Sequence, residues 1–120
     1  MHLESKELAR RGEALAARFL EERGYQIVAR NWRVRGGEID LIATAGEQIV
    51  FIEVKTRSGR GFPAAEGVDG RKQHRIRALA LQWLSQARLH GSPVRFDVLA
   101  VYMARTPPYA ARVEHLEGAF

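Results

Sequence analysis

The stretch from residue 36 to residue 59, GGEIDLIATAGEQIVFIEVKTRSG, constrains the fold more than any other part of the chain. It contains two runs rich in apolar and β-branched residues, one on each side of Gly46 and Glu47. Glycine readily adopts the positive φ that a two-residue hairpin turn needs, so we take Gly46 and Glu47 as the centre of the turn. The chain is therefore expected to build a sheet around an antiparallel hairpin.

This turn determines which residues of the hairpin face one another. Counting outward from it places Asp40 opposite Glu53 and Glu38 opposite Lys55. Directly paired residues point to the same face of a sheet, so these four charged side chains are expected to form one cluster. The other face is apolar, which gives the register a hydrophobic reason to hold. Its residues are Ile39, Leu41, Ala43, Val50, Ile52 and Val54.

The segments around the hairpin predict further elements. Helical periodicity predicts two helices, over residues 5–23 and 71–89. Strand-forming residues predict strands over residues 25–34 and 94–103, with a final short strand or edge segment over residues 112–120. Glycine, proline and serine predict a loop over residues 58–70. The order is αβββαβ, and without a repeat or a linker we expect residues 1–120 to form a single domain.

Charge and composition narrow the function classes. The net charge of +5 favours an anionic partner such as nucleic acid. No run approaches the roughly 20 apolar residues that cross a membrane, which argues against a membrane protein. The first segment carries acids and lacks an apolar core, so we expect neither a signal peptide nor a transit peptide, and a cytoplasmic location. There is no cysteine, and the four histidines lack metal-ligand spacing.

The charged cluster on the hairpin has two interpretations. A solvated group of surface ions accounts for Glu38 beside Lys55, but it leaves Asp40 facing Glu53. At roughly 5 Å and an effective dielectric constant of about 20, two such charges repel by roughly 3 kcal/mol. A divalent cation between the carboxylates would replace repulsion with coordination by hard oxygen ligands, which Mg²⁺ prefers.

The first helix offers a third acid. Helical spacing puts Glu13 at the margin of the apolar face rather than on the fully solvated face. From there the carboxylate can reach inward over the sheet or outward to solvent, and the spacing leaves both open.

Four sequence blocks together resemble a known family. Asp40, followed by the triplet Glu53, Val54 and Lys55, resembles the D-(x)n-(D/E)-x-K signature of the restriction-endonuclease-like, or PD-(D/E)xK, nuclease superfamily. The blocks GEALAARFL, GGEIDLIA, VFIEVKTRS and RFDVLAV resemble the bacterial YraN-like family of small predicted endonucleases, which is itself similar to archaeal Holliday junction resolvases. The resemblance covers nearly the whole chain. It implies an α/β fold with a restriction-endonuclease-like αβββαβ core, a central mixed sheet flanked by helices.

The resemblance also assigns roles to residues of the cluster. It implies that Asp40 and Glu53 ligate Mg²⁺, for which Mn²⁺ can substitute, and that the Val54 carbonyl adds a ligand. It implies that Lys55 orients or activates a water molecule, and that Glu13 matches the helix glutamate of the resolvase-like branch. Glu38 stands where the superfamily has proline, and its role stays open.

A nuclease of this kind also needs a surface for DNA. We expect basic residues after the hairpin and at the start of the second helix, whose backbone N–H groups favour phosphate, to hold the DNA. These are Arg57, Arg60, Arg71, Lys72, Arg75 and Arg77. Gln73 and His74 can also reach the site from that helix, but the sequence does not distinguish them from bystanders.

Three functions compete. The first is a Mg²⁺-dependent DNA endonuclease, with branched or otherwise structured DNA as one substrate class. The second is a non-catalytic module that binds DNA or RNA on the same fold, and the third is an interaction protein with a surface ion cluster. A module that only binds nucleic acid has no reason to hold opposed carboxylates where phosphates must approach. These acids therefore favour the endonuclease. Symmetric cutting of two strands needs two sites, so we also expect a homodimer, with residues 94–103 and 117–120 as candidate contacts.

Overall fold

The computed structural model describes residues 2–58 and 68–120. Its elements are, in chain order, α1 (Ser5–Glu21), β1 (Gln26–Val34), β2 (Gly37–Ala45), β3 (Gln48–Arg57), α2 (Gly70–Gln86), β4 (Val94–Met103) and β5 (Ala111–Leu116). The expected αβββαβ order is therefore confirmed, and the last segment forms a strand.

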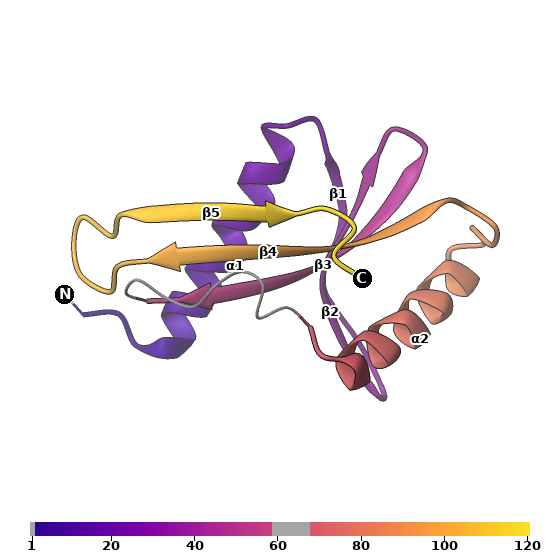
Figure 1. The fold of residues 1–120 in the computed structure, drawn as a ribbon, viewed down its shortest axis with the longest axis horizontal. Helices are drawn as coiled ribbons and strands as arrows, with labels where there is room; N and C mark the ends of the chain where they lie inside the picture. Colours follow the sequence, from indigo (N-terminus) through magenta and orange to yellow (C-terminus); the bar gives the residue numbers. More distant parts are fainter. Residues whose placement is uncertain (1, 59–67) are drawn as a thin grey trace.

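The strands form one mixed sheet in the order β1-β2-β3-β4-β5 (Figure 1). Three neighbouring pairs are antiparallel: β1 with β2, β2 with β3, and β4 with β5. Only β3 and β4 run parallel, and α2 lies between them in the chain. Parallel neighbours need a crossover connection, which a helix usually supplies. This is the expected α/β, restriction-endonuclease-like architecture.

The hairpin has the predicted register near its turn and departs from it farther out. Gly46 adopts a φ of 62°, and the pairing of β2 with β3 runs from Ala45 and Gln48 to Leu41 and Ile52. The ladder ends there, so the expected pairing of Asp40 with Glu53 and of Glu38 with Lys55 is wrong. The physical reason is that β1 and β2 cross the direction of β3, β4 and β5, and so turn away from β3 at this point (Figure 1).

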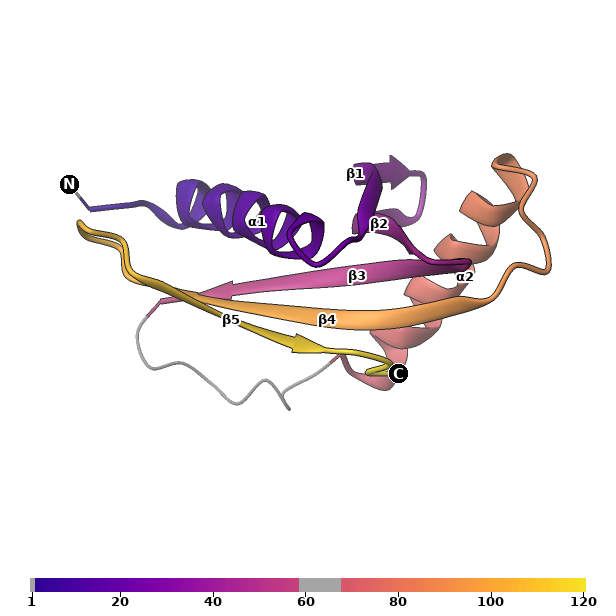
Figure 2. The same cartoon turned by 90° about the horizontal axis from the view of Figure 1, so that it is seen from above.

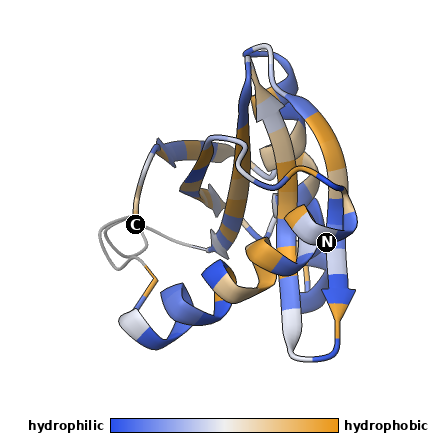
Figure 3. Cartoon of the chain, turned by 90° about the vertical axis from the view of Figure 1, so that its right-hand side faces the viewer, coloured by the Kyte–Doolittle hydropathy of each residue, from blue (hydrophilic) through white to orange (hydrophobic). Residues whose placement is uncertain are grey.

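Helices cover the sheet on both sides, and each side has its own core (Figure 2). The core under α1 contains Leu41, Ala43, Val50 and Ile52, with Val54 packed against it, as predicted. The core under α2 contains Ile42, Ile49 and Phe51, together with Ile39. The expectation that Ile39 shares a face with Leu41 is therefore wrong, because β2 bends where its pairing with β3 stops. Figure 3 shows hydrophilic and hydrophobic residues alternating along α2, the helix that follows the grey trace, and hydrophobic stretches within the strands.

The second helix ends earlier than its sequence predicts. It stops at Gln86 because Arg88 takes a φ of 58°, which breaks the helical path before the expected end at residue 89. The Leu89 N–H then donates to the Leu84 carbonyl at 2.9 Å, a hydrogen bond typical of helix C-termini that close with a left-handed residue.

The end of the chain packs against its own domain. The Ala119 N–H donates to the Phe96 carbonyl at 2.8 Å, and the Phe120 ring stacks on the Phe96 ring with centroids 5.2 Å apart. Strand β4 is paired on both sides, with β3 and β5. It therefore offers no open edge to a second copy, which corrects the expectation that residues 94–103 form a dimer contact. Neither helix in the described ranges is long and apolar enough to cross a membrane.

Candidate functional site

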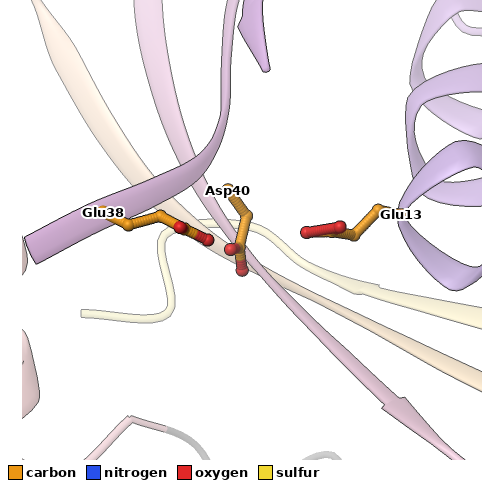
Figure 4. Close-up of side chains that lie close together, drawn as sticks. All are labelled: Glu13, Glu38 and Asp40. Atoms are coloured by element: carbon orange, nitrogen blue, oxygen red, sulfur yellow. The ribbon is translucent and has the colours of Figure 1, made fainter. Parts of the chain in front are cut away.

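Three carboxylates from two elements meet beside the point where β2 leaves β3. Glu13 comes from α1, and Glu38 and Asp40 come from β2. One carboxylate oxygen from each lies within 4.8 Å of the others. In Figure 4, Glu13 and Glu38 reach toward Asp40 from opposite sides. Of the two orientations that the sequence left open for Glu13, the structure has the inward one. It also brings in Glu38, whose role the sequence left open.

Close contact between α1 and β3 places Glu13 over the sheet. Its neighbour Gly12 is buried, and a Cβ atom at that position would lie 2.0 Å from Oγ1 and 2.6 Å from Cγ2 of Thr56. No side chain fits into that space. The helix can therefore approach β3 only because residue 12 is glycine, and this approach brings the next residue, Glu13, to the other acids.

Gly12→Ala should lower the free energy of unfolding by about 1–3 kcal/mol, because the new methyl group must push α1 away from Thr56. Urea unfolding of both proteins measures this destabilisation. The matched control is Gly70→Ala in α2, since no atom lies within 4 Å of a Cβ atom added there. The control should be neutral or stabilising, because alanine loses less backbone entropy in a helix. Equal stability of Gly12→Ala and the parent would show that α1 adjusts without cost.

Asp40 is the most perturbed of the three acids. Burial raises its pKa to about 7, and the negative charges of Glu53, Glu13 and Glu38 add to this, opposed by a hydrogen bond from Val54. In that bond the Val54 N–H donates to Asp40 Oδ2 at 2.8 Å. The side chain of Asp40 thus occupies the place where the next ladder bond would have formed. Burial and the charge of Glu38 also raise the pKa of Glu13.

Glu53 lies next to this group but is held by another residue. Its carboxylate forms an ion pair with Lys72 of α2, with Nζ and Oε1 2.7 Å apart, and its side chain is 12% exposed. Lys72 was expected to contact DNA phosphates, whereas in the structure it neutralises an acid of the site. Glu53 remains close enough for its charge to raise the pKa of both Asp40 and Glu13.

The other predicted members of the site are placed by the same strands. Lys55 is half-buried on β3, two residues beyond Glu53. Val54 packs its side chain against the α1 core and donates its N–H to Asp40. Glu38 pairs with Arg33 of β1 through Arg33 Nε, a partner that the sequence did not predict. The structure therefore brings four acids together, with Arg33 paired to Glu38 and Lys72 paired to Glu53.

The residues expected to hold DNA are spread over α2 and the end of β3. Arg57 and Arg71 are exposed, and Arg75 is exposed with its stem near Gly37. Arg77 lies over the rings of Phe96 and Phe120, at 5.0 and 5.5 Å from their centroids. Gln73 donates from Nε2 to the Val68 carbonyl at 2.7 Å, which fixes the start of α2. His74 is exposed, and Arg60 lies outside the described residues.

The structure also places residues at the site that the sequence did not single out. Arg10, Arg30 and Asn31 line a hollow of about 200 Å³ that Glu13 also lines. A signal was present, because Arg10 and Glu13 are three residues apart on one helix and share a face. Arg30 carried no such signal, because the direction of a strand side chain depends on how the strand pairs with its neighbours.

The arrangement of the acids fits a divalent cation. Carboxylate oxygens are the ligands that Mg²⁺ prefers, at about 2.0–2.1 Å, so ligands on opposite sides of the ion stand about 4.2 Å apart. Adjacent ligands of the same octahedral ion stand about 3.0 Å apart, so the three oxygens, which lie within 4.8 Å of one another, must move closer together to bind one ion. Burial first, and the negative charges of Glu53, Glu13 and Glu38 second, raise the pKa of Asp40, and a bound cation would oppose both effects. Glu13, Glu38 and Asp40 are thus the residues best placed to hold a cation, with Glu53 next to them.

Comparisons with known proteins identify the family of the chain. Residues 12–101 match the Uncharacterised protein family UPF0102. Curated relatives of that name include one from Rhodococcus opacus, 50% identical over 94% of this chain and 95% of the relative. One from Frankia casuarinae is 54% identical over 94% and 95%, and one from Moorella thermoacetica is 50% identical over 91% of each. With half of the residues identical over nearly the full length of both chains, this protein belongs to the UPF0102, or YraN-like, family.

Proposed function

We propose that residues 1–120 form a single metal-dependent endodeoxyribonuclease domain that hydrolyses phosphodiester bonds, with branched or structured DNA as its substrate class. The observation that carries this proposal is the convergence of Glu13, Glu38 and Asp40 within 4.8 Å. Two features support it further: the family's D-(x)n-(D/E)-x-K pattern at Asp40, Glu53 and Lys55, and the net charge of +5.

In this proposal the acids hold Mg²⁺, or Mn²⁺ in its place, and the cation acts as a Lewis acid on the phosphoryl oxygens. Asp40 is the central ligand, and the Val54 N–H fixes its orientation at 2.8 Å. Glu53 would add a ligand if Lys72, now paired with it at 2.7 Å, released it, and the Lys72 ammonium would then be available to a phosphate. The Val54 carbonyl adds a further ligand. Lys55 orients the attacking water and offsets the negative charge that develops on the phosphate.

Cleavage of labelled DNA tests the proposal. Four-way, flap and linear DNA substrates are incubated with Mg²⁺, Mn²⁺ or EDTA, and the products are resolved on denaturing gels. We expect cleavage with either metal, none in EDTA, and none for Asp40→Asn. Glu47→Gln, which removes an exposed acid at the hairpin turn, is the matched control and should cleave normally. Cleavage by Asp40→Asn at the parental rate, or no cleavage of any substrate, contradicts the proposal.

Lys55→Ala should abolish cleavage and leave metal affinity nearly unchanged, because a lysine ammonium is not a metal ligand but does offset charge in the transition state. Single-turnover cleavage measures the first effect, and titration with Mn²⁺ followed by thermal melting measures the second. Parental cleavage by Lys55→Ala would remove this residue from the proposed mechanism.

The ion pair between Glu53 and Lys72 favours a second candidate. Lys72 satisfies Glu53 without a metal, as expected in a module that binds nucleic acid on this fold and does not cleave it. The same assay separates the two, because such a module would shift the DNA in a native gel and yield no products. For the nuclease we also propose a two-fold dimer, which sedimentation with and without a four-way junction tests.

A further inference from the structure

A groove leads away from the acidic cluster between α1 and β1. Figure 2 shows both elements on the same side of β3. The hollow of about 200 Å³ at Glu13 shares Arg10, Ala14 and Arg30 with a neighbouring hollow of about 550 Å³. These two hollows adjoin and form one groove, the α1–β1 groove. It runs from the acids over the exposed face of α1 toward Met103, at the end of β4, and Tyr109, in the segment between β4 and β5.

Positive charge dominates the far part of this groove. Arg10, Arg11 and Arg18 reach it from α1, and Arg30 reaches it from β1. Two acids oppose these four cations: Glu21 lines the groove, and Glu7 pairs with both Arg10 and Arg11. Arg11 and Arg18 are seven residues apart, so they lie on one stripe of the helix, two turns from each other. Arg30 and Glu21 are 4.0 Å apart and about half exposed, so their mutual attraction is weak. The excess of cations suits a chain of phosphates.

The floor of the same part of the groove is apolar and aromatic. Leu15, Met103 and the Tyr109 ring line it, and the Arg11 guanidinium lies over that ring, 4.8 Å from its centroid. Tyr109 has a φ of 57°, which is rare for a bulky residue. Asn31, which lines the hollow at Glu13, has a φ of 49°. Backbone held in such conformations is concentrated at ligand sites.

We propose that the α1–β1 groove holds an unpaired DNA strand that leaves the acidic cluster, with phosphates on Arg18 and Arg30 and a base against Tyr109. The proposal rests on the proposed nuclease function and specifies its substrate class. An aromatic floor between phosphate-binding arginines is typical of single-strand binding, because the face of a base is available for stacking only when the base is outside a duplex. The substrate therefore carries an unpaired segment next to the scissile phosphate, as a flap does.

Binding in EDTA tests the groove independently of cleavage. Fluorescence anisotropy compares a labelled oligothymidine with a duplex of equal length, over a series of salt concentrations. Arg18→Ala and Arg30→Ala should each flatten the salt dependence for the single strand by about 0.7 log unit for each phosphate that the arginine neutralised. The matched control is Arg112→Ala on β5, because Arg112 is also an exposed strand arginine paired with a glutamate. It should bind both DNAs like the parent.

A second variant separates stacking from charge. Tyr109→Asn removes the ring and keeps a residue that tolerates positive φ, so the turn should fold. It should weaken single-strand binding by roughly 5-fold to 100-fold and leave duplex binding unchanged, whereas Tyr109→Phe should retain parental affinity. Equal weakening on both DNAs, parental salt dependence in the two arginine variants, or no single-strand binding by the parent would overturn the proposal.

The outcomes for the groove and for the nuclease are distinguishable. If the protein cleaves DNA but its groove variants bind single strands normally, the groove proposal is wrong and the nuclease proposal stands. If the groove variants bind single strands weakly but the parent cleaves nothing with Mn²⁺, the groove stands as a binding surface and the nuclease proposal is wrong.

Discussion

Asp40→Asn should make the metal-free protein more stable than the parent at pH 8, by an amount on the order of 2 kcal/mol. Asp40 is shielded from water, and it is also close to three other acids, and both effects raise its pKa to about 7. The parent must therefore hold a costly negative charge at pH 8, whereas the asparagine has none. The asparagine carbonyl can still accept the hydrogen bond from Val54, so the variant loses little in exchange.

The pH dependence of this difference has a definite sign. An aspartate in the unfolded chain titrates near about 3.9, whereas Asp40 in the folded protein has a pKa of about 7. Between these values the folded state binds more protons than the unfolded state, so this group makes the parent less stable as the pH rises from about 4 to about 7. The advantage of Asp40→Asn should be absent below about pH 4 and fully present above about pH 7. Urea unfolding in EDTA at a series of pH values measures it.

Added metal should reverse the order of the two proteins. A ligand that binds only the folded state stabilises it by about 2.7 kcal/mol at a concentration 100 times its dissociation constant. The parent should gain this stability from Mn²⁺, and Asp40→Asn should gain little of it. Glu47→Gln should follow the parent at every metal concentration. If Asp40→Asn is less stable than the parent in EDTA at pH 8, or if Mn²⁺ does not change the stability of the parent, these acids form an ordinary ion cluster and not a metal site.

The hairpin shows how far sequence reasoning reaches in this protein. Gly46 identified the turn, and counting outward from it, as for the acids, correctly pairs Ile42 with Phe51 and Leu41 with Ile52. These pairs are local, so spacing along the chain determines them. Ile39 lies only two residues farther on, and its predicted face was wrong. Periodicity assumes a regular strand, and the bend of β2 depends on how α1 and α2 pack against the sheet.

The acidic site also contains features that the sequence predicts and features that it does not. Asp40 and Glu53 could be found from their spacing in the hairpin, and Glu13 from its place on a helix margin. The pairing of Glu53 with Lys72 could not be predicted, because it depends on where α2 docks after a long connection. Charge alone suggested that Lys72 contacts phosphate. A lysine at a helix start has the same sequence pattern whether it contacts a ligand or an acid of its own chain.

A buried charge on β4 was also present in the sequence and was not used. Asp97 lies inside the otherwise apolar run of this strand, where a charged residue needs partners to be buried. Its side chain is fully buried. It accepts hydrogen bonds from Arg95 Nε at 2.8 Å, from Arg95 Nη2 at 2.7 Å and from the Gly118 N–H at 2.9 Å. His115 Nε2 lies 2.7 Å from Asp97 Oδ2. One carboxylate thus joins β4, β5 and the end of the chain.

Asp97→Ala should cost about 3–5 kcal/mol of unfolding free energy at pH 7, because it leaves the largely buried guanidinium of Arg95 and the ring of His115 without their acceptor. Only 20% of the Arg95 side chain and 11% of the His115 side chain are exposed, so water cannot replace the carboxylate. The matched control is Glu114→Ala, which breaks an ion pair with Arg112 of the same 2.7 Å length at an exposed position. That change should cost at most about 1 kcal/mol.

Acid should narrow the difference between Asp97→Ala and the parent by at most about 2.6 kcal/mol, the part that comes from the charge of Asp97. Burial alone would raise the pKa of Asp97, but the hydrogen bonds from His115, Arg95 and Gly118 outweigh burial and hold the pKa at about 2. Its contribution to stability is therefore fully present above the unfolded value of about 3.9 and disappears as the pH falls toward 2. Urea unfolding of the parent and the variant from pH 7 to pH 2 should show a difference that is constant above about pH 4 and shrinks as the pH falls from about 4 to about 2. A difference that stays constant down to pH 2 would mean that Asp97 stabilises the fold by packing rather than by its charge.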